Sequence, residues 1–448
     1  MSITKSNFNI TPASLDSYQE ALSYLYNQLP MFSRTGAAAY KPGLDTSYRL
    51  DDFFGHPHRK FKSIHIGGTN GKGSTSSMLA AILQAQGYKT ALYTSPHLVD
   101  FRERIRINGE MIPKKEVVDF VKRWQQSGYD GHPSFFELTM MMAFDWFAKE
   151  EVDYAIIEVG MGGRLDSTNI ITPLLGIITN ISFDHTQFLG DTIPKIALEK
   201  AGIIKPGIPA IIGETTDETR NIFNQKAKET NSEITFAEDD KDAVISIKQP
   251  AEYYGWECIT REGNFLLPLG GEYQKKNLQT VLATIKALRK SGIDISASNV
   301  AKGIENVSCF TGLQGRWSIL SNSPLAIADT GHNIAGISYN MEQLNRIIAS
   351  SGTAKLHMVI GFVADKDIEH IIELLPKHAK YYLTNAQIPR ALPADKLYEI
   401  FIQKGFTAEK FPDVSLAYKA ATTSSSPEDV IYVGGSTFIV ADLLAYLQ

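Results

Sequence analysis

The sequence predicts an α/β protein in which a doubly wound, mostly parallel sheet is followed by a smaller Rossmann-like α/β domain. Three observations indicate this architecture. A short apolar strand enters a glycine-rich turn with one lysine and then a helix, over residues 64–83. Apolar runs without polar alternation recur along the chain, and they alternate with amphipathic segments. We expect the first domain to span residues 1–311 and the second to span 312–448.

The elements of the first domain follow from local patterns. Apolar residues at helical spacing predict helices, uninterrupted apolar runs predict buried parallel strands, and a change of pattern after residue 232 predicts short, partly antiparallel strands. The expected helices are 17–29, 51–54, 78–83, 135–148 and 273–290. The expected strands are 64–66, 90–94, 154–159, 174–181, 210–213, 244–247, 256–259 and 264–268.

The second domain begins after a predicted boundary at Leu313–Trp317. Beyond it, a smaller series of apolar runs predicts strands at 325–329, 356–361, 381–384 and 430–435.

Composition excludes several classes of protein. The chain has 448 residues, 43% of them hydrophobic, and a net charge of −5, so nothing indicates a nucleic-acid surface. The two cysteines, Cys258 and Cys309, have no metal-ligand spacing. Residues 1–7 lack the apolar core of a signal peptide, and no apolar run approaches the roughly 20 residues that span a bilayer. We expect a soluble cytoplasmic protein without a membrane partner.

The turn at 67–74 predicts a phosphate-binding loop. Its glycines let backbone N–H groups close around phosphate oxygens, and Lys72 can reach the terminal phosphates of a nucleoside triphosphate. The common pattern places Ser or Thr after the lysine, but here Gly73 follows. A hydroxyl for Mg²⁺ must therefore come from Ser74, Thr75 or elsewhere. A glycine-rich turn that binds nothing is the alternative.

Other polar residues follow the expected strands, where ligands of open parallel sheets bind. They are Ser95, Glu158 and the pair Asp184 and His185. Mg²⁺ prefers oxygen ligands, so Glu158 is a candidate ligand, whereas His185 suits Mn²⁺ or a base. Each also has a structural interpretation, as a paired acid at a sheet end or a structural histidine.

Two further residues have plain structural interpretations. Arg164 and Asp166 could pair with each other across a turn, and Lys200 would ordinarily be a solvated lysine at a helix end.

Six motifs together resemble the folylpolyglutamate synthase/dihydrofolate synthase family of the Mur ligase superfamily, in the family's order and over nearly the whole chain. They are Gly68–Ser74, Ser95–Leu98, Glu103–Arg106, Glu158–Asp166, Asp184–Thr186 and Glu199–Ile203. The resemblance implies an ATP-dependent ligase of folate metabolism. Such an enzyme phosphorylates a folate or dihydropteroate carboxylate with ATP, and the amino group of L-glutamate then attacks the acyl phosphate.

The resemblance also implies roles for single residues. ATP contacts are expected from Thr69, Asn70, Gly71, Lys72, Gly73, Ser74, Asn277, Arg316 and Asp329. Magnesium ligands are expected to be Ser95, Glu158 and His185. Substrate contacts are expected from Ser134, Phe135, Phe136, Glu137, Leu165, Asp166 and Ser167. Lys72, His185 and Lys200 are the expected catalytic residues, with Lys200 matching a carbamylated lysine of the family.

Alternatives remain open at this stage. The enzyme could be bifunctional, which residues 134–137 favour, or act only as a folylpolyglutamate synthase. A cell-wall Mur ligase would carry an extra N-terminal domain, and only about 60 residues precede the loop here. A nucleotide-dependent switch would need no glutamate site. The stretch Asp329–Ile334 departs from the family's usual sequence at Gly331 and Ile334. ATP, glutamate and the pteroate compound are the expected partners of a monomer.

Overall fold

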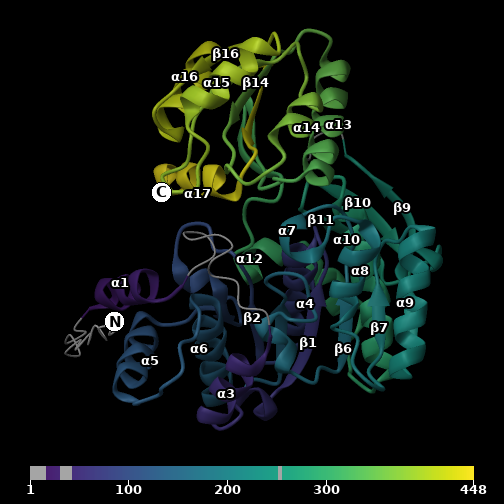
Figure 1. Ribbon diagram of the computed structural model, residues 1–448. Helices are drawn as coiled ribbons and strands as arrows, with labels where there is room; N and C mark the ends of the chain where they lie inside the picture. The colour runs from purple at the N-terminus through teal and green to yellow at the C-terminus, as the bar shows by residue number, and fades with distance from the viewer. Residues whose placement is uncertain (1–16, 31–42, 251–254) are drawn as a thin grey trace, which may run out of the picture.

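The computed structural model describes residues 17–30, 43–250 and 255–448. An eight-stranded sheet forms the centre of the first part of the chain, drawn purple to teal in Figure 1. Its order is β4 (Glu110–Met111), β3 (Ile105–Ile107), β2 (Thr90–Tyr93), β5 (Tyr154–Glu158), β1 (Lys62–Gly67), β6 (Leu175–Ile178), β7 (Ala210–Ile212) and β8 (Ile234–Phe236). All neighbours from β2 to β8 are parallel, whereas β3 and β4 are antiparallel additions at one edge.

The central strands are buried on both faces, which explains their uninterrupted apolar runs. Ile64 and Ile156 pack on one face with α4 (Lys72–Gln86), α10 (Gln274–Lys290), α11 (Ala297–Glu305) and α12 (Val307–Thr311). Ala155 and Ile157 pack on the other face with α1 (Tyr18–Gln28), α3 (Asp45–Phe53), α5 (Lys114–Gln126) and α6 (Phe135–Lys149). Alternate residues of one strand thus build two separate cores.

Beyond β6, the helices α8 (Ile193–Ala201) and α9 (Asp217–Thr230) cover residues of β6 and β7. The short α7 (Thr186–Leu189) precedes α8. An antiparallel sheet of β9 (Val244–Lys248), β10 (Trp256–Thr260) and β11 (Gly263–Leu267) packs beside α11, as the change of pattern after residue 232 predicted. The 3₁₀ segments among the described residues of this part are η2 (Pro57–Lys60), η3 (Phe101–Arg104), η4 (Ser167–Ile170) and η5 (Ala237–Asp239).

A second sheet of six strands follows, drawn green to yellow in Figure 1. Its order is β12 (Ser318–Asn322), β13 (Leu325–Ala328), β17 (Val430–Gly434), β14 (Leu356–Ile360), β15 (Lys380–Leu383) and β16 (Thr407–Lys410). Only β12 runs antiparallel to its neighbour. The helices α13 (Ile334–Ser351), α14 (Ile368–Glu373) and α15 (Ala394–Gln403) share one core with it, and α16 (Val414–Ser424) and α17 (Thr437–Leu447) share the other.

The predicted fold class is confirmed, with some differences in detail. Helix α3 begins at Asp45, six residues earlier than expected. The edge strands β4, β8, β12 and β16, and β3 next to the edge, were not predicted because these strands are short and partly polar. The predicted division at residue 312 lies between α12 and β12, and it stays a prediction. Residues 1–7, which bear on the expected absence of a signal peptide, lie outside the described residues.

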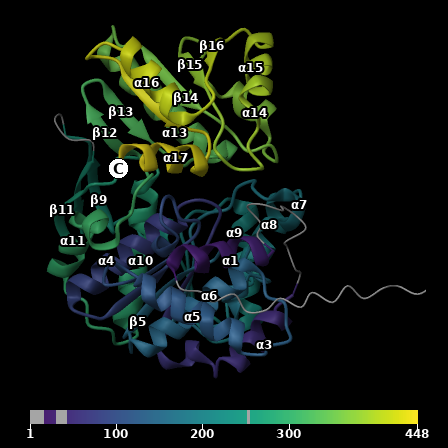
Figure 2. The ribbon, with the colours of Figure 1, turned by 90° about the vertical axis from the view of Figure 1, so that its left-hand side faces the viewer.

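The two sheets lie one above the other, and α17 of the second part faces the first (Figure 2). Among the described residues, no helix combines the length and the apolar character needed to cross a bilayer.

Candidate active site

The predicted phosphate loop joins β1 to α4. Gly68 and Gly71 both have positive φ, at 136° and 82°. A Cβ at Gly68 would clash with the Thr179 hydroxyl, and one at Gly71 would clash with the Asn277 amide. Glycine is therefore required at both positions on conformational and steric grounds. The Lys72 ammonium donates to the carbonyl oxygens of Gly68 and Thr69, each at 3.2 Å, so the lysine folds back over its own loop.

The hydroxyls that follow Lys72 do not lie on a cavity wall. Ser74 and Thr75 are fully buried, and the Ser74 hydroxyl accepts a hydrogen bond from Gln274 Nε2 at 3.1 Å. Of the sources considered for a metal-binding hydroxyl, Ser95 is the one that reaches the cavity.

A cavity of about 390 Å³ opens beside the loop, and residues of both sheets line it. Most of the sequence-predicted site residues lie on its wall: Thr69, Asn70, Lys72, Gly73, Ser95, Ser134, Phe135, Phe136, Glu137, Glu158, Leu165, Asp166, Ser167, His185, Lys200, Asn277, Arg316 and Asp329. Gly71 and Ser74 are not on that wall. Residues more than 300 positions apart are thus brought to one space.

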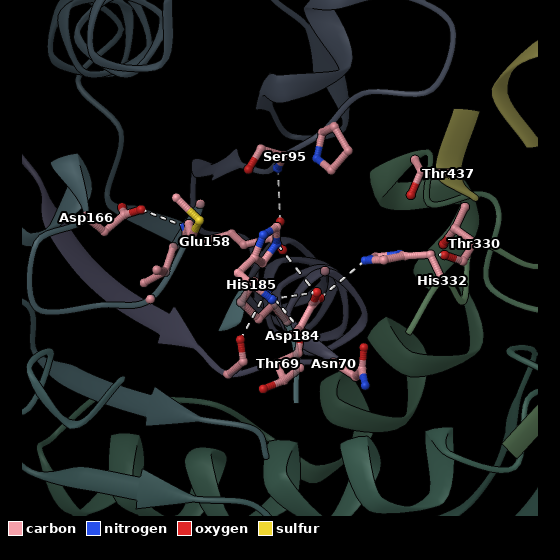
Figure 3. Close-up of a pocket in the computed structure, with 18 of the residues that line it drawn as sticks. Thr69, Asn70, Ser95, Glu158, Asp166, Asp184, His185, Thr330, His332 and Thr437 are labelled. Carbon is pink, nitrogen blue, oxygen red and sulfur yellow. Dashed lines mark hydrogen bonds and ion pairs between the residues drawn. The ribbon is translucent and has the colours of Figure 1, made fainter. Parts of the chain in front are cut away.

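Glu158 ends β5 next to the phosphate loop (Figure 3). Its carboxylate accepts the backbone N–H of Ser95 at 3.1 Å. Burial raises the pKa of Glu158, and the nearby Lys72 and Arg316 lower it in part. A buried carboxylate between two cations and a hydroxyl residue fits an oxygen ligand of a divalent cation.

His185 lies in the left-handed region, at φ 50°, which turns its side chain toward the cavity. Burial lowers its pKa to about 4, so the imidazole is neutral at pH 7. Within the described part of the chain, no three His, Cys, Asp or Glu side chains cluster as a metal site. A cation here would therefore depend on the Ser95 hydroxyl in addition to Glu158 and His185.

Asp184 connects the two parts of the molecule. Its carboxylate lies 3.4 Å from His332 Nε2 (Figure 3). It also lies 2.5 Å from Lys366 Nζ, and it accepts a hydrogen bond from Asn333 Nδ2 at 3.2 Å. All three partners come from the second sheet's part of the chain. Despite its burial, the hydrogen bond and charge of His332 hold the pKa of Asp184 well below its usual range.

Lys200 is not the solvated lysine that its place in the sequence suggests. The side chain is 4% exposed, near the end of α8, and its ammonium donates to the Gly68 carbonyl at 2.9 Å. Burial, with a smaller contribution from Lys72, lowers the pKa of Lys200 to about 7. This lysine is therefore largely neutral at slightly alkaline pH.

The possible pairing of Arg164 with Asp166 is not found. Arg164 instead pairs with Glu199 at 2.7 Å. Asp166 accepts the Met161 N–H at 2.8 Å and the Thr168 hydroxyl at 2.5 Å, and burial raises its pKa. This network fixes the carboxylate on the cavity wall.

The helix α6 begins on the same wall. Ser134 is its N-cap, and the Glu137 carboxylate accepts both the Ser134 N–H, at 2.7 Å, and the Ser47 hydroxyl, at 3.1 Å. This capping box holds the first turn in place. Phe135 and Phe136 are thereby fixed as apolar walls of the cavity.

The second part of the chain contributes Arg316 and Asp329. Arg316 donates to the Gly315 carbonyl at 3.2 Å and approaches the phosphate loop at Gly73. Asp329 is 2% exposed and accepts hydrogen bonds from Trp317, Tyr273, Gly331 and Asn340. These hydrogen bonds organise the loop around Asp329. Its contact with ATP stays a prediction.

Several cavity residues were not predicted as site residues, among them Lys366 and Arg104. Lys366 lies beyond β14, and Arg104 ends η3. The reasoning that located Glu158, which examines residues past each strand, would have found Lys366 had it been applied to the second domain. Arg104 precedes an antiparallel edge strand, where that reasoning does not apply.

Comparison with known proteins identifies the family. Residues 66–285 match the Mur ligase middle domain, and residues 315–437 match the Mur ligase glutamate ligase domain. The chain is 30% identical over 447 residues to the Bacillus subtilis dihydrofolate synthase/folylpolyglutamate synthase, covering 96% of this chain and 99% of that relative. The chain belongs to the folylpolyglutamate synthase/dihydrofolate synthase family. It therefore belongs among ATP-dependent ligases of the Mur superfamily, as predicted.

Further members of the family agree. A probable bifunctional folylpolyglutamate synthase/dihydropteroate synthase of Haloferax volcanii is 31% identical over 437 residues, and this chain spans about half of its length, 50%. The structure of E. coli FolC with DHPP and ADP has a TM-score of 0.82 and 30% identity over 98% of this chain and 99% of that one. The Yersinia pestis bifunctional enzyme, complexed with AMPPNP and a Mn ion, has a TM-score of 0.81 and 29% identity over 98% and 100%.

Proposed function

We propose that this protein joins L-glutamate to the carboxylate of dihydropteroate and of reduced folates, with ATP as the phosphate donor. One observation carries the proposal: a single cavity collects the phosphate loop, the Glu158 carboxylate and the fixed Asp166 and Ser134 segments. This arrangement supports a nucleotide site at the phosphate loop and, next to it, a site for a flat substrate with polar edges. The names of the relatives support the same reaction.

The reaction has two steps. A carboxylate oxygen of the acceptor attacks the terminal phosphorus of ATP, and ADP leaves with the electrons of the broken bond. The neutral amino group of glutamate then attacks the acyl carbon, loses a proton, and phosphate leaves. Neither step needs a covalent enzyme nucleophile, so the protein acts by positioning and by charge neutralisation.

Residues of the phosphate loop would bind ATP. Thr69, Asn70 and Gly73 would surround the phosphates, and Gly71 and Ser74, which do not line the cavity, would contribute through their backbone. Lys72 would leave its two carbonyl partners to neutralise the terminal phosphate. Arg316 lies where it can add a second positive charge. Asn277, whose amide lies against Gly71, and Asp329 would complete the nucleotide contacts.

Ser95, Glu158 and His185 would hold Mg²⁺. The cation would supply charge neutralisation at the phosphates when bound. The neutral imidazole of His185 and the buried carboxylate of Glu158 both line the cavity, which supports this role.

Lys200 would be carbamylated. The reactive form is the neutral amine, which burial favours here. Its nitrogen attacks CO₂ and releases one proton, so the buried cation is replaced by an anion. The new carboxylate oxygens would face the phosphate loop and could help hold a second cation.

The acceptor would lie against α6. Phe136 offers an apolar face to a pterin ring, whereas Phe135, whose ring stacks with Tyr26 and lies under Arg104, would contribute to the wall beside it. Asp166, with Leu165 and Ser167, offers the polar edge of the pterin a fixed hydrogen-bonding partner. Ser134 and Glu137 shape the same wall. Because both parts of the chain line the cavity, their approach would exclude water from the acyl phosphate. We infer that the two parts are domains that divide at residue 312.

A substrate panel tests the proposal. Purified protein is given ATP, Mg²⁺ and glutamate with dihydropteroate, with tetrahydrofolate or with neither, and ADP release and the ligated product are measured. We expect turnover that requires glutamate and either acceptor. Turnover with tetrahydrofolate but not with dihydropteroate would establish an enzyme that acts only as a folylpolyglutamate synthase. ADP release without an acceptor, or only with UDP-linked cell-wall substrates, would refute the proposal. A monomeric state and a cytoplasmic location stay predictions.

A further inference from the structure

One cavity residue has no part in the reaction described so far. Arg104 belongs to the motif Glu103–Arg106, in which the other charged side chains form hydrogen bonds with backbone groups. The Glu103 carboxylate accepts the N–H groups of Leu98 and Asp100 at 2.8 and 2.7 Å. Arg106 donates to the Gly109 carbonyl at 2.8 Å. Arg104, in contrast, is 6% exposed and lies on the cavity wall.

The Arg104 guanidinium is held on one side only. Its Nε donates to His97 Nδ1 at 2.7 Å, and the group lies over the Phe135 ring, 5.3 Å from the centroid. Burial and the charge of Arg104 lower the pKa of His97 to about 3, so His97 is neutral and adds no counter-charge. Across residues 17–30, 43–250 and 255–448, Arg104 forms no ion pair, and its two terminal NH₂ groups have no hydrogen-bond acceptor.

A buried guanidinium keeps its proton. The charges of Glu158 and Glu103 act on Arg104, but neither carboxylate forms an ion pair with it in the described part of the chain, so its burial is only partly compensated. Its planar pair of NH₂ groups matches the two oxygens of a carboxylate. The contacts with His97 and Phe135 fix the orientation of the group before any ligand arrives. The wall of the cavity therefore carries a preformed carboxylate site.

The order of the strands locates this site relative to the chemistry. From β1 outward, the loop ends of the sheet carry the phosphate loop, Glu158, Ser95 and then Arg104, whose carbonyl accepts the Thr94 N–H at 3.1 Å. Arg104 is thus one strand, about 5 Å, beyond Ser95. Lys72 and Arg316 also act on Glu158 more strongly than Arg104 does. A substrate carboxylate bound at Arg104 would therefore lie next to the substrate carboxylate that reacts.

We propose that Arg104 binds the α-carboxylate of the terminal glutamate in a folylglutamate acceptor while the γ-carboxylate of that glutamate reacts. The two carboxyl carbons of glutamate are four C–C bonds apart, about 5 Å when extended, which matches the one-strand offset. The inference rests on the proposed function. Dihydropteroate has a single carboxylate and would leave Arg104 unused, so this residue distinguishes the two acceptors.

The test compares acceptors with and without the second carboxylate. Wild type, Arg104→Gln, Arg104→Lys and the control Arg102→Gln are assayed with tetrahydrofolate monoglutamate, its α-carboxamide and dihydropteroate. Arg102 is a matched control because it lies in the same 3₁₀ turn but is already paired with Asp100, at 2.7 Å. KM and kcat for each acceptor, and KM for glutamate, are measured by ADP release.

We expect Arg104→Gln to raise KM for tetrahydrofolate roughly 10- to 100-fold, as loss of a charge-assisted bidentate contact implies, and Arg104→Lys to recover part of it. The α-carboxamide and dihydropteroate should change by less than about threefold, as should all substrates with Arg102→Gln. In the wild-type enzyme, KM for tetrahydrofolate monoglutamate should itself be roughly 10- to 100-fold lower than KM for its α-carboxamide. This comparison needs no variant to fold.

Three results would overturn the inference. Equal losses with all acceptors would place the reacting carboxylate at Arg104. A raised KM for glutamate with every acceptor would place the incoming amino acid there. Equal KM values for the carboxylate and the carboxamide in wild type would remove the site altogether. Absence of turnover with every acceptor in wild type would instead refute the proposed function.

Discussion

Replacing Lys200 by methionine should stabilise the protein in acid and much less in alkali. The ammonium is buried 2.9 Å from the Gly68 carbonyl, and Lys72 adds a second positive charge nearby. Methionine keeps much of the length of the side chain and removes the charge. The pH dependence of the difference therefore reports the burial of this one group.

The magnitude follows from the pKa. Folding lowers the pKa of Lys200 from 10.5 to about 7, which corresponds to about 5 kcal/mol of destabilisation when the group is charged in both states. The native state then binds fewer protons than the unfolded state between pH 7 and 10.5, so stability rises with pH across that window. The gain from Lys200→Met should be about 5 kcal/mol at pH 6 and about 2 kcal/mol at pH 9, less a constant of about 1 kcal/mol for the lost hydrogen bond.

Urea unfolding of both proteins from pH 6 to pH 9.5 measures this difference. Buffers free of CO₂ keep the amine unmodified. Lys195→Met is the control, since this lysine lies on the same helix, is largely exposed and pairs with Asp191 at 2.8 Å. A difference between wild type and Lys200→Met that does not vary with pH would refute the argument, because it would mean that folding leaves the pKa of Lys200 unchanged.

Three further substitutions address the site. Lys72→Ala should lower ligation at least about a thousandfold with an unchanged circular dichroism spectrum, because the terminal phosphate loses its cation; wild-type ADP release would contradict this. Glu158→Gln should raise the apparent dissociation constant of Mg²⁺ about tenfold or more, since the buried ligand loses its charge, and an unchanged metal titration would exclude that role. Lys366→Gln removes the cation 2.5 Å from Asp184 and should lower kcat/KM for ATP about tenfold, whereas unchanged kinetics would make this contact dispensable.

The sequence predicted those parts of the fold that depend on local pattern. The strands β1, β5 and β6 are buried on both faces, so their apolar runs are distinctive. Gly68 and Gly71 adopt backbone conformations that favour glycine. The glycines themselves are visible in the sequence, so the turn could be predicted from them. The candidate residues past these strands were found because the ends of parallel strands meet at one edge.

Other features depend on tertiary packing and have no local signal. Lys200 follows Glu199 on a helix, and nothing in that pattern distinguishes the exposed member from the buried one. The difference arises because the α8 backbone packs closely against Gly163, and the Lys200 ammonium reaches the phosphate loop. Resemblance to a family indicated Lys200, whereas the residue pattern alone did not. Arg104 belongs to one of the six motifs, but no role for it was predicted, since the absence of an ion pair at its guanidinium among the described residues is visible only in three dimensions.

The contacts between the two parts of the chain link nucleotide binding to their approach. Asn70 of the phosphate loop and Asn333 exchange amide hydrogen bonds at 3.2 and 3.0 Å, and Asn333 is also the N-cap of α13. Asp184 adds its bonds to Lys366 and Asn333 beside them. A phosphate that moves Asn70 must therefore disturb the pairing that positions α13. If the loop binds ATP as proposed, the nucleotide would lie next to the contact between Asn70 and Asn333, so binding and the approach of the two parts of the chain would be coupled.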